Sequence, residues 1–160
     1  MITTDRLILR KFTSEDVQGY AEIMAKKNVY QYLGSGNKLP KEIIPHMISQ
    51  WNDTFVDGLG VYAVAEKETG KLVGHSGVRM LPCGRIEILY AFDDLVWGKG
   101  YATESAQVVL KHHTIRPLIA ISYPENKSSI NVIEKLGFER AGAEEFFGKQ
   151  LEVFTLKEWD

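Results

Sequence analysis

The segment from residue 85 to residue 123 constrains the fold most, because a strand, a helix and a second strand follow one another within it. Residues 85–92 alternate in polarity as a strand does, and residues 101–113 repeat apolar side chains at helical spacing. Residues 118–123 form a continuous apolar run of the kind found in buried strands. A crossover of this type is right-handed and its two strands are parallel, so the chain is expected to contain a parallel pair inside its sheet.

The segments on either side of this crossover predict antiparallel strands. Residues 61–66 and 72–80 flank a glycine-containing turn, as do residues 138–147 and 150–157, so each pair is expected to form a hairpin. A further strand is expected at residues 6–12, where a short apolar run has alternating ends.

Three other segments have the apolar spacing of amphipathic helices, namely 15–27, 40–51 and 126–136. Ser14 is the expected N-cap of the first of them, and Gly137 is the expected left-handed residue that ends the last. Together these elements predict an α+β fold with a mixed sheet of about seven strands, a central βαβ crossover and about four helices.

Composition limits what such a fold can do. The 160 residues are 44% hydrophobic and 25% charged, which suits a single domain over residues 1–160 with a core of its own. The 19 basic and 21 acidic residues give a net charge of −2, so no basic surface for nucleic acid is expected. There is one cysteine, no apolar run of membrane-spanning length and no signal-peptide pattern at the N-terminus. We therefore expect a cytoplasmic protein that binds neither nucleic acid nor a membrane.

The turn before the crossover helix carries the strongest chemical signal, and it reads Trp97-Gly98-Lys99-Gly100-Tyr101-Ala102-Thr103. Glycines let the backbone approach a ligand, and the first amides of a helix have no internal partner and lie at the positive end of its dipole. The turn therefore predicts a phosphate or pyrophosphate site, although an ordinary βα turn with two glycines also fits the spacing. A Walker loop is disfavoured because Tyr101 follows Gly100 where that motif needs Lys and then Ser or Thr. A dinucleotide fingerprint is disfavoured because Thr103 replaces its third glycine.

These residues resemble the signature segments of the GNAT N-acetyltransferase superfamily. One segment runs from Trp97 to Glu104, and the other from Asn126 through Ser129 to Phe138. The N-terminal segment Thr4-Asp5-Arg6-Leu7-Ile8-Leu9-Arg10 resembles the ribosomal-protein-alanine N-acetyltransferase-like branch. The resemblance covers essentially the whole chain in the same element order. It implies splayed parallel strands, acetyl-CoA (coenzyme A) as co-substrate, and direct acetyl transfer to a primary amine.

The resemblance also implies where acetyl-CoA lies. Its pyrophosphate is expected on the amides of the glycine-rich turn, and its pantetheine arm beside the backbone of Ala91 and Phe92 in the gap between the parallel strands. Asn126 is expected to hydrogen-bond the arm, and Ser129 to lie beside the thioester sulfur. The expected cofactor contacts are Ala91, Phe92, Trp97, Gly98, Lys99, Gly100, Tyr101, Ala102, Thr103, Asn126 and Ser129.

Acetyl transfer needs a base for the amine proton and a donor for the departing thiolate. Glu87 matches a strand glutamate of the family and is the expected base, with an exposed strand carboxylate as the alternative. Many relatives use a tyrosine as the acid at a position that is Ile133 here, so Ser129 is the expected substitute and Tyr123 a reserve. Leu89 stands where relatives often carry glycine, which allows this strand to depart from their bulged geometry.

Other functions stay open on the sequence alone. A GNAT-shaped acyl-CoA sensor or partner-binding module without catalysis is the alternative that the missing tyrosine supports, and a nucleotide-binding α/β domain is a third. The acceptor is expected to be a small-molecule amine or a peptide N-terminus, selected by loops 28–58 and 144–150. The mildly acidic C-terminal half is compatible with a cationic acceptor. No metal site is expected, and both a monomer and a homodimer fit the sequence.

Overall fold

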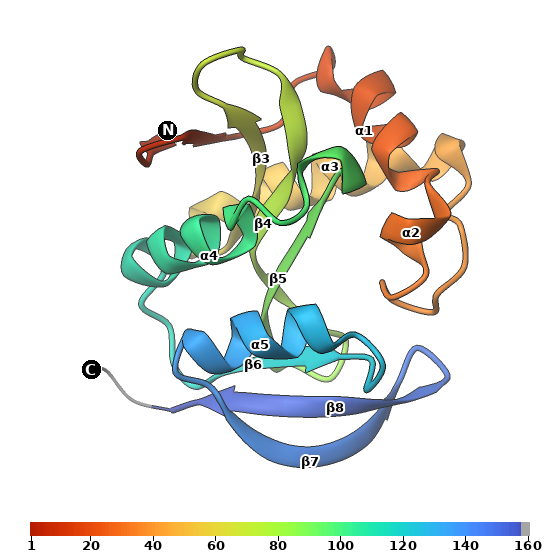
Figure 1. Ribbon diagram of the computed structural model, residues 1–160, viewed down its shortest axis with the longest axis vertical. Coiled ribbons are helices and arrows are strands. Elements are labelled where there is room, and N and C mark those ends of the chain that lie inside the picture. Colours follow the sequence, from red (N-terminus) through yellow and green to blue (C-terminus); the bar gives the residue numbers. More distant parts are fainter. Residues whose placement is uncertain (158–160) are drawn as a thin grey trace.

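A mixed sheet of eight strands organises the chain, and the computed structural model describes residues 1–157 of it (Figure 1). The strands lie in the order β1-β2-β3-β4-β5-β6-β8-β7 across the sheet. All neighbouring strands are antiparallel except β5 and β6, which are parallel. The strands are β1 (Ile2–Thr3), β2 (Leu7–Arg10), β3 (Gly60–Glu66), β4 (Leu72–Met80), β5 (Ile86–Phe92), β6 (Leu118–Ser122), β7 (Glu139–Phe146) and β8 (Lys149–Leu156).

Helices cover both faces of the central strands. Strand alternation sends Val61 and Ala63 of β3 into an apolar cluster with α1 and α3, and Tyr62 and Val64 into a second cluster with α4 and α5. The sheet is therefore buried on both faces at its centre. The helices are α1 (Asp16–Met24), α2 (Lys27–Tyr30), α3 (Ile44–Asp53), α4 (Tyr101–His112) and α5 (Lys127–Lys135), with 3-10 turns η1 (Lys41–Ile43), η2 (Thr54–Asp57) and η3 (Asp94–Val96).

The predicted α+β architecture and its central crossover, β5–α4–β6, are confirmed, with differences at the ends of elements. The eighth strand arises because residues 2–3 pair antiparallel with β2, which adds the two-residue β1. The fifth helix is α2, which is separate because Lys26 has an extended backbone after α1 ends. Ser14 is not the N-cap of α1. Glu15 holds that position without a side-chain cap, and the Asp16 carboxylate instead accepts the Thr13 amide and pairs with Arg10.

Two local expectations near the crossover can be compared directly. Gly137 has a φ of 96°, as predicted for a left-handed residue after α5. Strands β4 and β5 pair in continuous register from Gly74–Phe92 to Met80–Ile86, so the strand that carries Leu89 has no bulge against β4.

The parallel strands β5 and β6 pair only at Glu87 and Ile119. From there their C-terminal halves diverge, while β6 pairs along its whole length with β8 on its other side. Residues 88–92 and 120–122 therefore border a gap in the middle of the sheet, as the resemblance implied.

Candidate active site

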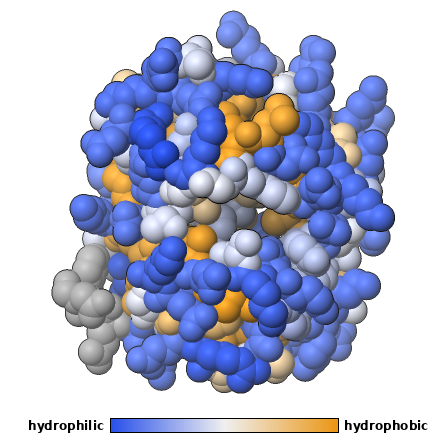
Figure 2. Space-filling view, in the orientation of Figure 1, coloured by the Kyte–Doolittle hydropathy of each residue, from blue (hydrophilic) through white to orange (hydrophobic). Residues whose placement is uncertain are grey.

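A cavity of about 1010 Å³ occupies this gap. Both diverging strands line it, from Glu87 to Phe92 and from Ala120 to Tyr123. On one face of the sheet it extends toward α1 and α3, and on the other toward the N-terminal ends of α4 and α5. Figure 2 shows a hollow near the middle of one face of the molecule, bordered by weakly polar and hydrophobic side chains. Of the residues predicted from sequence, all line this cavity except Lys99.

The glycine-rich turn presents a row of unpaired backbone donors. The amides from Gly98 to Thr103 hydrogen-bond to no residue within the described range 1–157. Gly98 and Gly100 each have a φ of 83°, which lets the chain turn so that consecutive amides are exposed. Tyr101, the first residue of α4, and the two residues after it also lie at the positive end of a twelve-residue helix. The turn therefore offers a set of backbone donors of the kind that suits an anion.

The Lys99 side chain does not line the cavity, although the Lys99 amide belongs to this row of donors. Its ammonium is 3.8 Å from the Glu66 carboxylate, which also accepts a hydrogen bond of 2.7 Å from the Tyr101 hydroxyl. The Lys99 charge therefore lies beside Glu66, and the donors that the turn offers are its amides.

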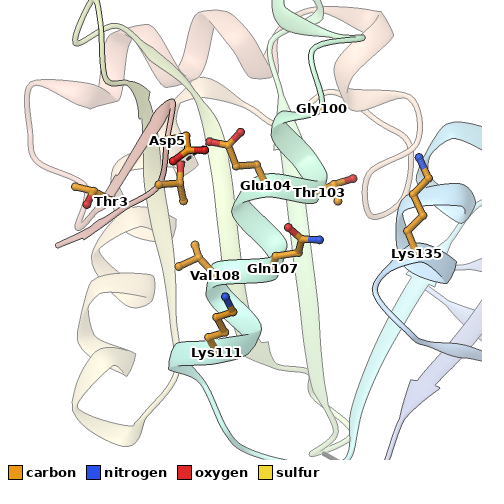
Figure 3. A pocket seen from close by; sticks show the side chains of 10 residues that line it. Thr3, Asp5, Gly100, Thr103, Glu104, Gln107, Val108, Lys111 and Lys135 are labelled. Carbon is orange, nitrogen blue, oxygen red and sulfur yellow. Dashed lines mark hydrogen bonds between the residues drawn. The ribbon is translucent and has the colours of Figure 1, made fainter. Parts of the chain in front are cut away.

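A second, more open groove of about 630 Å³ adjoins the glycine-rich turn (Figure 3). Thr103, Gln107 and Lys111 of α4 line it, and Lys135 of α5 lies on its opposite side (Figure 3). Gly100, Thr103 and Lys135 border both the groove and the cavity, so a long ligand can pass from one to the other.

The backbone groups that face the gap belong to alternate residues of β5. The Asp93 amide donates to the Val73 carbonyl of β4, and the Ala91 carbonyl faces Gly74, which is also on β4. Strand alternation then directs the amides of Tyr90 and Phe92 toward β6. The Phe92 carbonyl already accepts the Trp97 indole N–H at 2.9 Å. Of the two residues expected to contact the arm, Phe92 therefore directs its amide toward the gap, as Tyr90 does, whereas the Ala91 backbone faces β4.

Glu87 lies at the closed end of the gap, beside the last pair that joins β5 to β6. Its side chain is buried, with 5% exposure, so the alternative of an exposed carboxylate is wrong. Arg79, directly opposite on β4, donates from Nε to Glu87 Oε1 at 2.9 Å. Burial raises the pKa of Glu87, and the Arg79 charge and hydrogen bond oppose that rise.

Two hydroxyl groups meet on the other face of the gap. The Tyr90 hydroxyl lies 3.1 Å from Ser129 Oγ, which joins β5 to the first turn of α5. Burial raises the pKa of Tyr90 to about 12. Asn126 caps α5 by accepting the Ser129 amide at 3.3 Å. The sequence analysis missed Tyr90, and the signal that could have found it is its position three residues after Glu87, on the opposite face of the strand.

The wall toward α1 and α3 contains polar side chains that the sequence analysis also missed. His75 of β4 is 4% exposed, and its Nδ1 is 2.8 Å from the hydroxyl of Tyr20 on α1. Trp51 of α3 packs against the His75 ring, with 5.3 Å between the ring centroids. His75 and Arg79 are four residues apart on one strand and so share a face, which is the sequence signal that could have grouped them.

The segment from residue 28 to residue 39 covers the cavity between the ends of the two diverging strands. Lys26, just before it, pairs with Asp93 at 2.6 Å after β5, and the Tyr123 hydroxyl after β6 donates to the Gly34 carbonyl at 2.7 Å. Tyr123 is thus engaged in holding this segment. Within residues 28–58, which were expected to select the acceptor, the aromatic side chains of Tyr30, Tyr32 and Trp51 line the cavity, whereas Phe55 packs on Tyr62 elsewhere.

Within residues 1–157, no group of three His, Cys, Asp or Glu side chains is arranged to hold a metal ion. In the same range, no helix combines the length and the apolar character needed to cross a membrane.

Comparison with known proteins identifies the family. The acetyltransferase (GNAT) domain model matches residues 6–139. The uncharacterized N-acetyltransferase p20 of Bacillus licheniformis is 29% identical over 87% of this chain and 82% of its own length. The uncharacterized N-acetyltransferase YnaD of Bacillus subtilis (strain 168) is 30% identical over 92% of this chain and 86% of its own length.

The fold is also that of solved acetyltransferases. The ribosomal L7/L12 alpha-N-protein acetyltransferase RimL, solved in complex with coenzyme A, superposes with a TM-score of 0.80 at 17% identity. The match covers 98% of this chain and 96% of RimL. The resemblance drawn from the sequence is therefore confirmed: the chain belongs to the GNAT family of acetyltransferases.

Proposed function

We propose that this acetyltransferase moves the acetyl group of acetyl-CoA directly to a primary amine, with Glu87 as the general base. The acceptor is a small-molecule amine or a peptide N-terminus. The observation that carries the proposal is the position of Glu87, a buried carboxylate at the closed end of a gap in the sheet. Unpaired amides of the glycine-rich turn border the same cavity.

The residues around the cavity fit acetyl-CoA along its length. The amides from Gly98 to Thr103 suit a pyrophosphate at the N-terminal end of α4. The unpaired amides of Tyr90 and Phe92 suit an extended pantetheine arm, which would pair like an added strand. Asn126 uses Oδ1 to cap α5, and its Nδ2 donates to no residue within 1–157, so this donor is available for the arm.

Glu87 accepts the proton of the amine as the amine nitrogen attacks the acetyl carbon. A carboxylate with a raised pKa is a better base near neutral pH, and the contact with Arg79 favours its ionised form. Acetyl-CoA supplies the activated thioester. The N–C bond forms, the C–S bond breaks, the amine proton passes to Glu87, and the sulfur leaves as the thiolate of coenzyme A.

Tyr90 and Ser129 provide the hydroxyl groups for the departing sulfur. A Tyr90 pKa of about 12 lies well above that of an ordinary thiol, which is about 8.5. The hydroxyl therefore keeps its proton and stabilises the thiolate through a hydrogen bond, and solvent delivers the final proton. Tyr90 thus takes the place of the tyrosine that is absent at Ile133.

Two measurements test this function. Acetyl-CoA at about 100 times its Kd should stabilise the protein by about 2.7 kcal/mol, which raises Tm by about 5–10 °C, whereas AMP should have a much smaller effect. No shift at millimolar acetyl-CoA would contradict cofactor binding. Thiol release with a broad panel of amines then tests catalysis, since a chain that binds acetyl-CoA but releases no thiol with any amine would be a sensor.

A further inference from the structure

The acceptor side of the cavity places two polar side chains of β4 within apolar walls. We propose that the acceptor is a free amino acid with an apolar side chain, whose carboxylate is bound by Arg79 and His75 while its amine faces Glu87. This assignment rests on the proposed function, because it concerns the amine that receives the acetyl group. The products would be an N-acetyl amino acid and coenzyme A with a free thiol.

Arg79 has hydrogen-bonding capacity beyond its pair with Glu87. Nε donates to Glu87, whereas the two Nη atoms donate to no other side chain or carbonyl in residues 1–157. The side chain is 31% exposed and lines the cavity, with its guanidinium 5.9 Å from the ring centroid of Phe147. A planar guanidinium can hold one carboxylate at Nε and a second at its Nη edge.

His75 offers a second donor on the same face of β4. The Tyr20 hydroxyl is wholly buried and has only His75 Nδ1 as a partner in the described chain, so it donates its proton there rather than leave it unsatisfied. Nε2 then carries the ring hydrogen, and it has no partner within residues 1–157. Burial lowers the pKa of His75 to about 3, so the ring stays neutral and acts as a donor. The Arg79 charge also lowers this pKa. His75 and Arg79 lie four residues apart on β4 and both line the cavity, so they lie on the same face of the strand.

The charge of the cavity disfavours polycationic acceptors. Among the described residues that line it, the acidic ones are Glu87, which Arg79 already pairs, and the exposed Glu125. The basic ones are Arg79, Lys127 and Lys135. A polyamine or an aminoglycoside would therefore find no set of carboxylates for its extra charges. The mildly acidic C-terminal half is compatible with a cationic acceptor, but the described residues that line the cavity do not provide the carboxylates to match one.

The size and walls of the acceptor side suit a small apolar molecule. Trp51 packs on the His75 ring, and Met24 and Met47 line the same cavity; none of these three side chains carries a charge. The Tyr123–Gly34 hydrogen bond holds the covering segment across the cavity, which leaves less room for a protein surface than for a free amino acid. A peptide N-terminus would also present a neutral amide to Arg79 in place of a carboxylate.

The test compares each apolar amino acid with its own carboxamide, using thiol release and mass spectrometry of the product. Phenylalanine, leucine and methionine are suitable probes, and rates are corrected for the fraction of unprotonated amine. For wild type, kcat/KM should be about 10- to 100-fold higher for the acid than for the amide, as expected for a charge-assisted bidentate pair. Arg79→Gln should bring this ratio close to one. The ratio cancels effects on Glu87, because both substrates use the same base.

Lys41→Gln is the matched control, since it removes one positive charge from an exposed site outside the cavity and should keep the wild-type ratio. The wild-type ratio alone decides the proposal if Arg79→Gln does not fold. Amides acetylated as fast as the acids, or acetylation of spermidine or a peptide N-terminus in preference to both, would overturn the amino-acid assignment while leaving the acetyltransferase function intact. Failure of every amine to release thiol would overturn both.

Discussion

Replacing Glu87 by glutamine isolates the proposed base, because the amide has nearly the same shape and keeps an oxygen that can accept from Arg79 Nε. The side chain is buried and hydrogen-bonded at 2.9 Å, so the substitution removes a proton acceptor without opening a cavity. A general base contributes about 10²–10⁴-fold to the rate. We therefore expect kcat to fall by this factor, which corresponds to about 2.7–5.5 kcal/mol in the activation free energy.

The pH dependence should change in a defined direction. Burial raises the pKa of Glu87 above its ordinary value, and below that raised pKa the carboxyl holds a proton and cannot accept another. Wild-type kcat/KM should therefore decline as the pH falls through this pKa. Glu87→Gln lacks the group, so this inflection should disappear and the remaining rise with pH should follow the amine alone.

The Glu87 carboxyl should also affect folding stability, and its contribution should fall as the pH rises, whereas its contribution to activity rises. Its pKa is raised in the folded state, so the folded protein binds the proton more tightly than the unfolded chain does. The stability that this provides is complete below the unfolded pKa and is lost as the pH rises through the folded pKa. From mild acid to neutral pH, the free energy of unfolding should therefore decline less for Glu87→Gln than for wild type.

The assay is thiol release over a pH series, with thermal unfolding in the presence and absence of acetyl-CoA on the same samples. Glu125→Gln is the matched control, because it removes an exposed carboxylate at the same cavity. A Glu87→Gln enzyme with the wild-type pH profile and a rate within about threefold of wild type would refute the base assignment. Loss of the acetyl-CoA Tm shift in this variant would also refute the base assignment, because Glu87 would then be needed to organise the cofactor site.

Three further substitutions test the cofactor side. Gly100→Val should abolish acetyl-CoA binding in calorimetry while the protein still folds. A valine with left-handed backbone should lower the free energy of unfolding by about 1–2 kcal/mol. Gly58→Val, at a similar φ of 78° outside the cavity, should lower stability by the same amount without loss of acetyl-CoA binding. Asn126→Ala should lower stability by about 1 kcal/mol through the lost cap and also weaken acetyl-CoA binding, whereas Asn126→Asp should restore Tm but not affinity. Tyr90→Phe should lower kcat by about tenfold in thiol release through the lost hydrogen bond to the thiolate, whereas Tyr62→Phe, which loses a buried hydroxyl contact elsewhere, should not.

The parts of the site that the sequence predicted are those that depend on local chain geometry. The glycine-rich turn and the Asn126 cap each need only a few consecutive residues with particular φ angles or short polar side chains, so their sequence patterns are direct. The crossover follows from element order, because the handedness and direction of such a unit are nearly fixed. These features place the gap and one end of the cavity.

The acceptor side could not be predicted in the same way, because it depends on pairing between distant segments. Arg79 and Glu87 meet through the register of β4 with β5, and His75 meets Tyr20 of α1 across 55 residues. The alternation of polar and apolar residues along β5 also does not predict that Glu87 is buried. Polarity that alternates along a strand indicates one solvated face, but helices cover both faces of this sheet at its centre.

Strand alternation in β5 assigns the two halves of the proposed chemistry to opposite faces of the sheet. Glu87 lies on the face toward α1 and α3, where the acceptor would bind, and Tyr90, three residues later, lies on the face toward α5, where it meets Ser129. The only β5–β6 pair, at Glu87 and Ile119, fixes where the gap begins relative to both residues. A shift of one residue in the register of β5 against β4 would exchange the two faces and direct the carboxylate toward the thiolate, where its charge would oppose the reaction. The continuous, bulge-free pairing of β4 with β5 therefore matters as much to the proposed transfer as the identities of Glu87 and Tyr90.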